Sequence, residues 1–206
     1  MRDEKISDFL ARLADRVPAP GGGSSAALHA AQAAALLGMV ARYSTGEKYA
    51  EHKLTIERII TETDELRSTA LQLAADDAAA FTAVTDAYQL PKDSDTAKAA
   101  RSAAIATALV GAGRPPAEVI GAAQVAVELA EELLPIGNRN VITDIAAATE
   151  AARAAATTAR VNVEINLGGI KDEHARAELA AEADKVDDIA TRAERVTAAV
   201  RTEIST

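Results

Sequence analysis

An alanine-rich segment between Ser24 and Tyr43 constrains the fold of this chain most strongly. Alanine is its commonest residue, and its first charged side chain is Arg42. A helix that is apolar on every side is usually buried on every side, so we expect this segment to form the central helix of a larger assembly. A chain of 206 residues is long enough to bury roughly 70% of its unfolded surface as one unit. We therefore predict one helical domain spanning residues 1–206.

The scarcity of aromatic residues indicates how that domain is packed. Aromatic residues make up 2% of the chain, so the core has to be built from Ala, Leu, Ile and Val. Small side chains allow helix axes to approach closely, which favours an up-and-down bundle of long helices. No segment alternates between polar and apolar residues in the manner of a strand. The sequence thus predicts an all-α, multi-helix bundle that buries one flank against a second copy as a dimer.

Apolar spacing together with glycine and proline positions predicts seven helices. The "GAGRPP" segment is expected to separate the fourth helix from the fifth, and the diglycine at 168–169 is expected to end the sixth. The predicted ranges are 6–13, 24–43, 47–88, 94–110, 115–134, 140 or 143 to 168, and 179–204.

Charge and composition exclude several classes of function. The net charge is −9 and no dense block of Lys or Arg is present, so we expect no nucleic-acid partner. The charged first residues and the absence of eighteen uninterrupted apolar residues argue against a leader or a membrane span. The chain has no cysteine, and its three histidines lack metal-site spacing. We expect a cytoplasmic protein without metal or cofactor.

The segment "PAPGGGSS" precedes the central helix and leaves two interpretations open. A phosphate loop is excluded because no strand precedes the glycines and no Lys follows them. The glycines could form a simple turn, with Ser24 or Ser25 accepting hydrogen bonds as a helix cap. Alternatively, Gly21, Gly22 and Gly23 could expose backbone amides to an anionic or carbonyl-bearing ligand at the helix N-terminus.

Two adjacent acids, Asp76 and Asp77, stand in an otherwise alanine-rich helix. Neighbouring helical residues point about 100° apart, so only one of them can share a face with Phe81. Asp77 lies four residues before Phe81 and is expected on the more buried side. A buried carboxylate needs a hydrogen bond or an ion pair. A solvated surface acid remains the alternative.

Polar residues also cluster at both ends of the predicted sixth helix. Asn138 and Asp144 lie near its start, and Asn162 and Asn166 lie one turn apart near its end. Asp144 and Asn162 are five turns apart, so they share a face but are separated by about 27 Å within one subunit. The two end asparagines need partners, which could be a ligand or a neighbouring loop.

Five segments in this order resemble the formiminotransferase-cyclodeaminase family: "PAPGGGSSAAL", "MVARYSTGEKY", "DAAAF", "GNRNVITD" and "NVEINL". The resemblance extends over residues 5–200 and is closest to the cyclodeaminase domain and to stand-alone methenyltetrahydrofolate cyclohydrolases. It implies an all-α homodimer with a tetrahydrofolate site near or across the interface, and no cofactor. One departure is Arg114-Pro115-Pro116, where relatives commonly have Val-Pro-Leu.

The resemblance also implies roles for individual residues. Asp77 matches the acid to which proton transfer is assigned. The cations expected to attract an acidic folate tail are Arg42, Lys48 and Arg139. The rings expected to stack on the pterin are Tyr43, Tyr49 and Phe81. The residues expected to bind substrate are Gly21, Gly22, Gly23, Ser24, Lys48, Asn138, Asp144, Asn162 and Asn166.

The expected reaction is hydrolysis of 5,10-methenyltetrahydrofolate to 10-formyltetrahydrofolate. We favour it because the chain carries no transferase domain to supply a formimidoyl group. Ring closure of 5-formimidoyltetrahydrofolate with loss of ammonia is the alternative within the family. A helical dimer that binds a ligand or a partner without catalysis is the alternative of another class.

Overall fold

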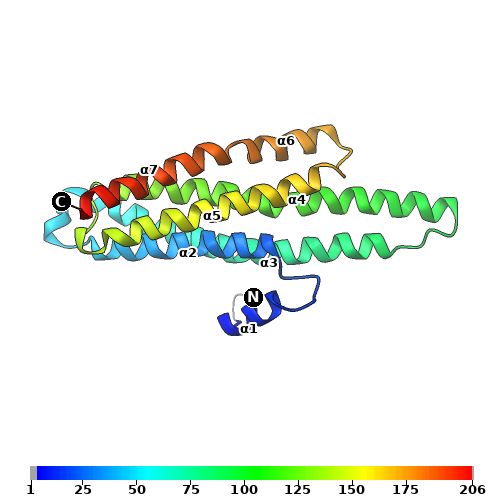
Figure 1. Ribbon diagram of the computed structural model, residues 1–206, viewed down its shortest axis with the longest axis horizontal. Coiled ribbons are helices and arrows are strands. Elements are labelled where there is room, and N and C mark those ends of the chain that lie inside the picture. Colours follow the sequence, from blue (N-terminus) through cyan, green and yellow to red (C-terminus); the bar gives the residue numbers. More distant parts are fainter. Residues whose placement is uncertain (1–3, 206) are drawn as a thin grey trace.

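The computed structural model describes residues 4–205, which form helices joined by short connections (Figure 1). The all-α prediction is confirmed for this part of the chain. Residues 1–3 and 206 of the predicted domain lie outside the described residues. In chain order the elements are α1 (Ile6–Leu13), α2 (Gly22–Tyr43), the 3-10 helix η1 (Glu47–His52), α3 (Lys53–Gln89), α4 (Asp95–Leu133), the 3-10 helix η2 (Arg139–Val141), α5 (Ile142–Leu167), α6 (Glu173–Asp184) and α7 (Val186–Ile204).

Four long helices, α2 to α5, run up and down along the long axis of the molecule (Figure 1). Helix α2 packs against α3 and α5, and α4 packs against the same two helices from the opposite corner. The α6–α7 segment covers α4 and α5, while α1 lies apart on the other side of the bundle. The interior is mainly alanine, valine, leucine and isoleucine, as the composition predicts.

Helix α2 is central but is not buried on all sides. Leu37 and Val40 are fully buried, whereas Gln32 and Ala35 are exposed. The expectation of complete burial was wrong because α2 occupies a corner of the four-helix core, and one stripe faces outward. Its length and mean hydropathy of 1.3 would suit a membrane span, but 61% of that window is buried inside the bundle.

Helix α4 continues without interruption through Pro115 and Pro116, so the predicted break at "GAGRPP" was wrong. A proline inside a helix costs about 3 kcal/mol because it lacks an amide and its ring crowds the preceding turn. Both rings are buried here, and the residues one turn earlier, Gly111 and Ala112, are small. Burial of this helix in the core outweighs the local preference for a break.

Two other predicted helices are divided. The segment expected to be helical from residue 47 begins as η1 and becomes α-helical only at Lys53. The last amphipathic helix breaks at Lys185, between α6 and α7. The break keeps the apolar residues of both halves, including Leu179 and Val186, against the bundle. Helix α5 ends beside the diglycine as predicted, although Gly168 is right-handed rather than left-handed.

The N-terminus of α2 lies beside the middle of α3. Beyond it, the end of α3 and the start of α4 continue as a hairpin (Figure 1). The end of α5 reaches the same region, because Asn162 lies against Gly22 and Gly169 lies near Leu109 of α4. Helices α3 and α5 therefore approach the first turn of α2, and this turn is where the candidate site forms.

Candidate functional site

The glycine run allows α3 and α5 to approach the first turn of α2 very closely. A Cβ atom at Gly23 would lie 2.0 Å from Oδ1 of Asp77, so only glycine fits beside this carboxylate. A Cβ at Gly22 would lie 3.5 Å from Nδ2 of Asn162, an ordinary contact. The close approach at Gly23 explains why the chain has no side chain there. The structure thus brings Gly22, Gly23, Asp77 and Asn162 together.

Asp77 acts as a cap for α2 from another helix. The residue that precedes α2, Gly21, has no side chain to cap it. Asp77 accepts hydrogen bonds from the Ser24 backbone amide and, at 2.9 Å, from the Ser24 hydroxyl. The expected cap by Ser24 or Ser25 is thus replaced, because the Ser24 hydroxyl donates to α3 instead of accepting from its own helix. This arrangement satisfies one of the amides that a helix start leaves without partners.

The environment of Asp77 favours its neutral form. Burial raises the pKa of this carboxyl above its ordinary value, and the hydrogen bonds from Ser24 oppose that rise. Asp76, by contrast, is exposed and accepts a hydrogen bond from Gln72 at 2.8 Å. The surface-acid alternative therefore describes Asp76 and not Asp77. Groups that transfer protons in enzymes are often partly buried and have a shifted pKa, as this carboxyl does.

The two asparagines near the end of α5 use their amide nitrogens as donors within their own helix. Nδ2 of Asn162 donates to the Thr158 carbonyl, and Nδ2 of Asn166 donates to the Asn162 carbonyl, each at 2.8 Å. Neither side chain bonds to a neighbouring loop, so that interpretation was wrong. Within residues 4–205, neither amide oxygen accepts a hydrogen bond. Both oxygens remain available to a donor on a ligand.

Exposed apolar side chains lie close in sequence to these polar groups. Phe81, one turn after Asp77, is 49% exposed, so it does not mark a buried face as expected. Val161 and Ile165, which flank Asn162 on α5, are 60% and 78% exposed. Large exposed apolar groups of this kind often mark a surface that contacts a ligand or another protein.

The remaining predicted residues lie at the other end of the bundle. The Asn138 side chain donates to the Tyr43 carbonyl at 2.9 Å, and its own backbone amide donates to the Ser44 hydroxyl at 2.8 Å. Asn138 therefore ties the α4–α5 connection to the end of α2. Lys48 lies over the ring of Tyr49, 5.4 Å from its centroid. Asp144 lies in the first turn of α5.

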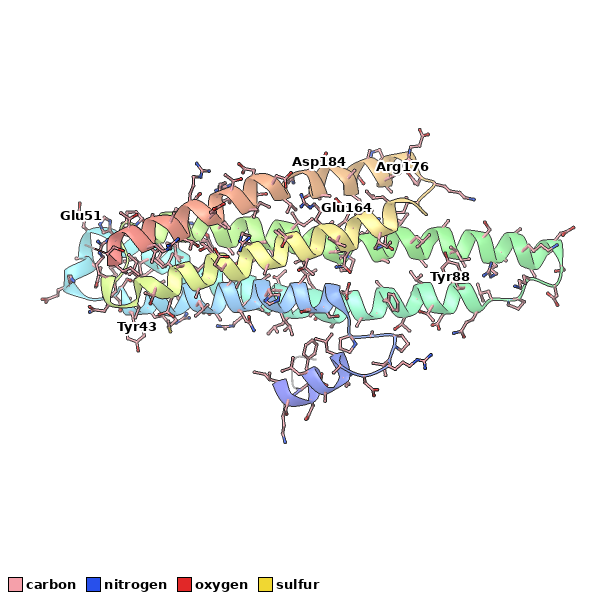
Figure 2. All side chains as sticks on the ribbon, viewed as in Figure 1. Tyr43, Glu51, Tyr88, Glu164, Arg176 and Asp184 are labelled. Atoms are coloured by element: carbon pink, nitrogen blue, oxygen red, sulfur yellow. The ribbon has the colours of Figure 1, made fainter. Side chains whose placement is uncertain are left out.

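Helix α5 is continuous from Asp144 to Asn162, so the expected separation of about 27 Å holds within one chain. The face between them carries small residues that are at least partly exposed: Ala147, Ala151, Ala154 and Thr158. In Figure 2, Tyr43 is labelled at one end of the molecule and Glu164 of α5 near the middle of its long axis. One chain therefore holds two separate groups of predicted residues.

Two of the cations expected to attract an acidic tail are already paired. Arg42 donates to Asp64 at 2.5 Å and to the Gly38 carbonyl, and Arg139 forms an ion pair with Glu203. Among residues 4–205, no group of three or more His, Asp or Glu side chains is placed to hold a metal ion.

Sequence reasoning missed that Ser24 donates a hydrogen bond to Asp77, because no local pattern predicts a contact between residues 53 positions apart.

Comparison with known proteins assigns this fold to a family. The family model described as formiminotransferase-cyclodeaminase matches residues 5–185. A methenyltetrahydrofolate cyclohydrolase of Methylorubrum extorquens is 39% identical over 171 residues, which is 82% of each chain. A formimidoyltransferase-cyclodeaminase of Mus musculus is 30% identical over 172 residues, and the match covers 32% of that longer protein.

A solved structure supports the same relationship. Formiminotetrahydrofolate cyclodeaminase from Thermotoga maritima superposes with a TM-score of 0.85 at 27% identity, over 97% of this chain and 98% of that one. The family resemblance drawn from the five sequence segments is confirmed. The family model covers well over half of the chain, and the chain belongs to the formiminotransferase-cyclodeaminase family.

Proposed function

We propose that this protein is a folate one-carbon enzyme that hydrolyses 5,10-methenyltetrahydrofolate to 10-formyltetrahydrofolate, with Asp77 as the proton-transfer group. The observation that carries the proposal is the partly buried Asp77 carboxylate, held by Ser24 beside the first backbone amides of α2. The cyclohydrolase of Methylorubrum extorquens, at 39% identity over most of both chains, supports this choice of reaction.

The chemistry requires a base beside a cationic ring. Water adds its oxygen to the carbon between N5 and N10, and Asp77 accepts one proton of that water. As the bond from this carbon to N5 breaks, Asp77 passes its proton to N5, and the second proton of the water is released when the hydroxyl becomes the formyl carbonyl. The negative charge of Asp77 also opposes the positive charge of the methenyl ring.

Ser24 is suited to hold Asp77 in both of its protonation states. Its hydroxyl lies 2.9 Å from Oδ2 of Asp77 and 3.0 Å from the Ala74 carbonyl, but it has only one hydrogen to donate. When Asp77 is ionised, the hydroxyl donates to the carboxylate. When Asp77 is protonated, the acid can donate to the hydroxyl, which then donates to Ala74. The fully buried Ser24 thus keeps every group paired through the cycle.

The other groups around the first turn of α2 are suited to bind the substrate. The first amides of α2, at Gly22 and Gly23, have no partner within their helix and suit a carbonyl oxygen of the pterin. The free amide oxygens of Asn162 and Asn166 suit its amino group. Phe81 offers an exposed ring for stacking.

The cyclodeaminase reaction is the second candidate. The solved relative that covers nearly the whole chain is called a formiminotetrahydrofolate cyclodeaminase, and the match to the mammalian proteins lies within formimidoyltransferase-cyclodeaminases. In that reaction Asp77 would deliver a proton to departing ammonia. The carbon held on N5 forms its bond to N10 as the bond to the departing ammonia breaks.

We further propose that the protein acts as a homodimer whose site draws on both subunits. A two-fold interface brings one surface of each subunit against the same surface of the other. Along the α5 face, such a contact places the Asp144 end of one subunit beside the Asn162 end of its partner. Lys48 and Asn138 would then approach the Asp77 of the other subunit. The exposed Val161 and Ile165 support this interface.

The proposed setting is cytoplasmic, with a folate as substrate and no cofactor, metal, nucleic acid or membrane as partner. The assay that tests the proposed reaction follows the near-ultraviolet absorbance of methenyltetrahydrofolate with and without the protein. Decay faster than in buffer alone supports the hydrolase. Release of ammonia from the formimidoyl substrate, without faster decay of the methenyl compound, would replace it with the deaminase. Inactivity on both would leave a non-catalytic ligand-binding dimer.

A further inference from the structure

A cavity of about 440 Å³ lies between α1 and the outward face of α2 and α3. Its walls are mainly apolar and include Leu13, Leu28 and Leu71, one from each of these helices. Sites for small molecules commonly have volumes of about 300 to 1,000 Å³ and predominantly apolar walls. The residues that line this cavity do not include Asp77, so the cavity is separate from the site of the proposed reaction.

Helix α1 turns its apolar face toward the cavity. Four of its side chains, spaced three and four residues apart, line the wall: Ile6, Phe9, Leu10 and Leu13. Phe9 is buried, whereas Ile6 and Leu10 are 80% and 53% exposed. An apolar group bound between α1 and α2 would remove these two side chains from water, which is favourable in proportion to the area covered.

Arg67 brings a positive charge to the cavity wall. Its Nη1 lies 3.1 Å from Oδ1 of Asp64, but the same carboxylate also accepts a hydrogen bond from Arg42 at 2.5 Å. One carboxylate between two guanidinium groups leaves a net charge of about +1. Glu4, which also lines the cavity, is paired with Arg12 at 3.0 Å. An anion beside Arg67 is therefore attracted locally, although the whole chain carries a net charge of −9.

The charge lies at one end of an elongated cavity. The α2 wall extends from Ser25 to Ala35, a rise of about 15 Å. Gly38 of α2 lies against Thr63 of the antiparallel α3. Arg67 is one turn further along α3, so it lies toward the Ala35 end of this wall. Ser25 marks the opposite end, beside the first turn of α2.

Polar side chains on the α2 wall add hydrogen-bonding groups. Ser25, His29 and Gln32 are spaced by four and three residues, so they share the outward face of α2. Within the described range 4–205, none of these three side chains forms a hydrogen bond. An apolar cavity with a few convergent polar groups is typical of a small-molecule site.

We propose that this cavity binds an elongated amphipathic monoanion, with its apolar body between α1 and α2 and its carboxylate beside Arg67. The inference does not depend on the proposed folate reaction. A second copy of the chain could also cover Ile6 and Leu10. The buried core of a subunit interface is usually depleted of charge, however, so the cation and the polar side chains of this wall favour a small anion.

The test uses two fluorescent probes that differ in charge. Anilinonaphthalene sulfonate is an amphipathic monoanion, and N-phenylnaphthylamine has the same rings without the sulfonate. Arg67→Gln removes the cation, and Arg153→Gln is its matched control. The two arginines are 46% and 49% exposed, each pairs with an acid three residues away, and Arg153 does not line the cavity. Ala35→Phe fills the cavity from its wall, and Ala198→Phe adds the same ring at an exposed position on α7.

The wild-type protein and both controls should bind the sulfonate probe with the same Kd. Arg67→Gln should weaken this binding about three- to tenfold and change the affinity for the neutral probe less than about two-fold. Ala35→Phe should weaken the binding of both probes more than about fivefold. Octanoate should displace the sulfonate probe, whereas acetate, which has the charge without the apolar body, should not. Equal Kd values for either variant and its control would overturn the proposal.

Two further outcomes would assign the cavity to another occupant and would contradict the proposal. Displacement of the sulfonate probe by tetrahydrofolate would make the cavity part of the substrate site. Loss of probe binding in step with dimer formation, followed by light scattering, would show that a second copy covers it. These measurements report binding and assembly alone, so they test the cavity even in a protein that turns over no folate.

Discussion

The Ser24 hydroxyl donates a hydrogen bond of 2.9 Å to the Asp77 carboxylate and joins the first turn of α2 to the middle of α3. Glycine at position 23 is what permits the contact, because any side chain there would overlap the carboxylate. The glycine run and the adjacent acid are therefore parts of one arrangement, and each of its members can be tested separately.

Gly23→Ala should abolish most of the activity, while Gly22→Ala should be tolerated. The added methyl group at position 23 meets Oδ1 of Asp77 at 2.0 Å and forces the carboxylate to move, whereas at position 22 it makes a contact of 3.5 Å with Asn162. A displacement of about 1 Å in a catalytic group can cost roughly a hundredfold in rate. The measurement is kcat/KM for each variant, alongside its melting temperature. Equal losses of activity in the two variants would show that close approach to Asp77 is not what the glycine provides.

Ser24→Ala should shift the acid limb of the pH–rate profile to higher pH. The hydrogen bond from Ser24 stabilises the ionised carboxylate, so its loss raises the pKa of Asp77 further, and a base needs its ionised form. The neighbouring Ser25→Ala is the matched control, since its hydroxyl makes no contact with Asp77. The profile is measured as kcat/KM against pH. An unshifted acid limb in Ser24→Ala would remove the proposed positioning role of this serine.

Asp77→Asn should stabilise the folded protein at neutral pH. Burial raises the pKa of Asp77, so the folded state binds its proton more tightly than the unfolded state does. At pH values above the pKa of Asp77 in the folded state, the ionised carboxylate therefore lowers the free energy of unfolding. This destabilisation disappears as the pH falls from the pKa of Asp77 in the folded state to its lower pKa in the unfolded state. The difference in unfolding free energy between variant and wild type should follow this course in urea titrations at several pH values. Asp76→Asn, at an exposed site, should show no such trend; a constant difference for Asp77→Asn would contradict the desolvation account.

Much of the fold follows from the sequence because it depends on local periodicity. The boundaries of α1, α2 and α5 are close to those predicted from apolar spacing and glycine positions. The course of α4 through Pro115 and Pro116 is not local information: it depends on how firmly neighbouring helices hold the segment. At these two prolines, packing against the neighbouring helices outweighs the low helix propensity of proline.

The candidate site was only partly accessible to sequence reasoning. The resemblance pointed to Asp77 and to the glycines, but their contact depends on the register between α2 and α3, which no single helix specifies. The donor role of Ser24 follows from that register. Another example is the pocket lined by Lys92, Lys98, Arg101 and Lys171, because its two segments, residues 92–102 and 169–171, meet only in the folded chain. No spacing within either segment predicts their meeting.

Mixed dimers test whether the site is shared between subunits. Asp77→Asn and Lys48→Gln are each expected to reduce activity, and mixing them should restore some of it. After random mixing, half of the dimers contain one subunit of each variant. Each of these dimers has one intact site and one inactive site, so about a quarter of all sites should be active. The mixture is measured after subunit exchange, against each variant alone. Activity no higher than the average of the two variants would place the whole site within one chain, and a monomer in light scattering would exclude the dimer itself.

The central claim is that Asp77 transfers the proton in hydrolysis of the methenyl group. The most direct measurement is kcat for the decay of 5,10-methenyltetrahydrofolate, compared between Asp77→Asn and the adjacent Asp76→Asn. The amide at position 77 keeps an acceptor for Ser24 but cannot accept a proton from water, so kcat should fall by roughly 10² to 10⁴. The exposed Asp76 should be replaceable with less than a two-fold change. Undiminished turnover by Asp77→Asn would contradict the assignment.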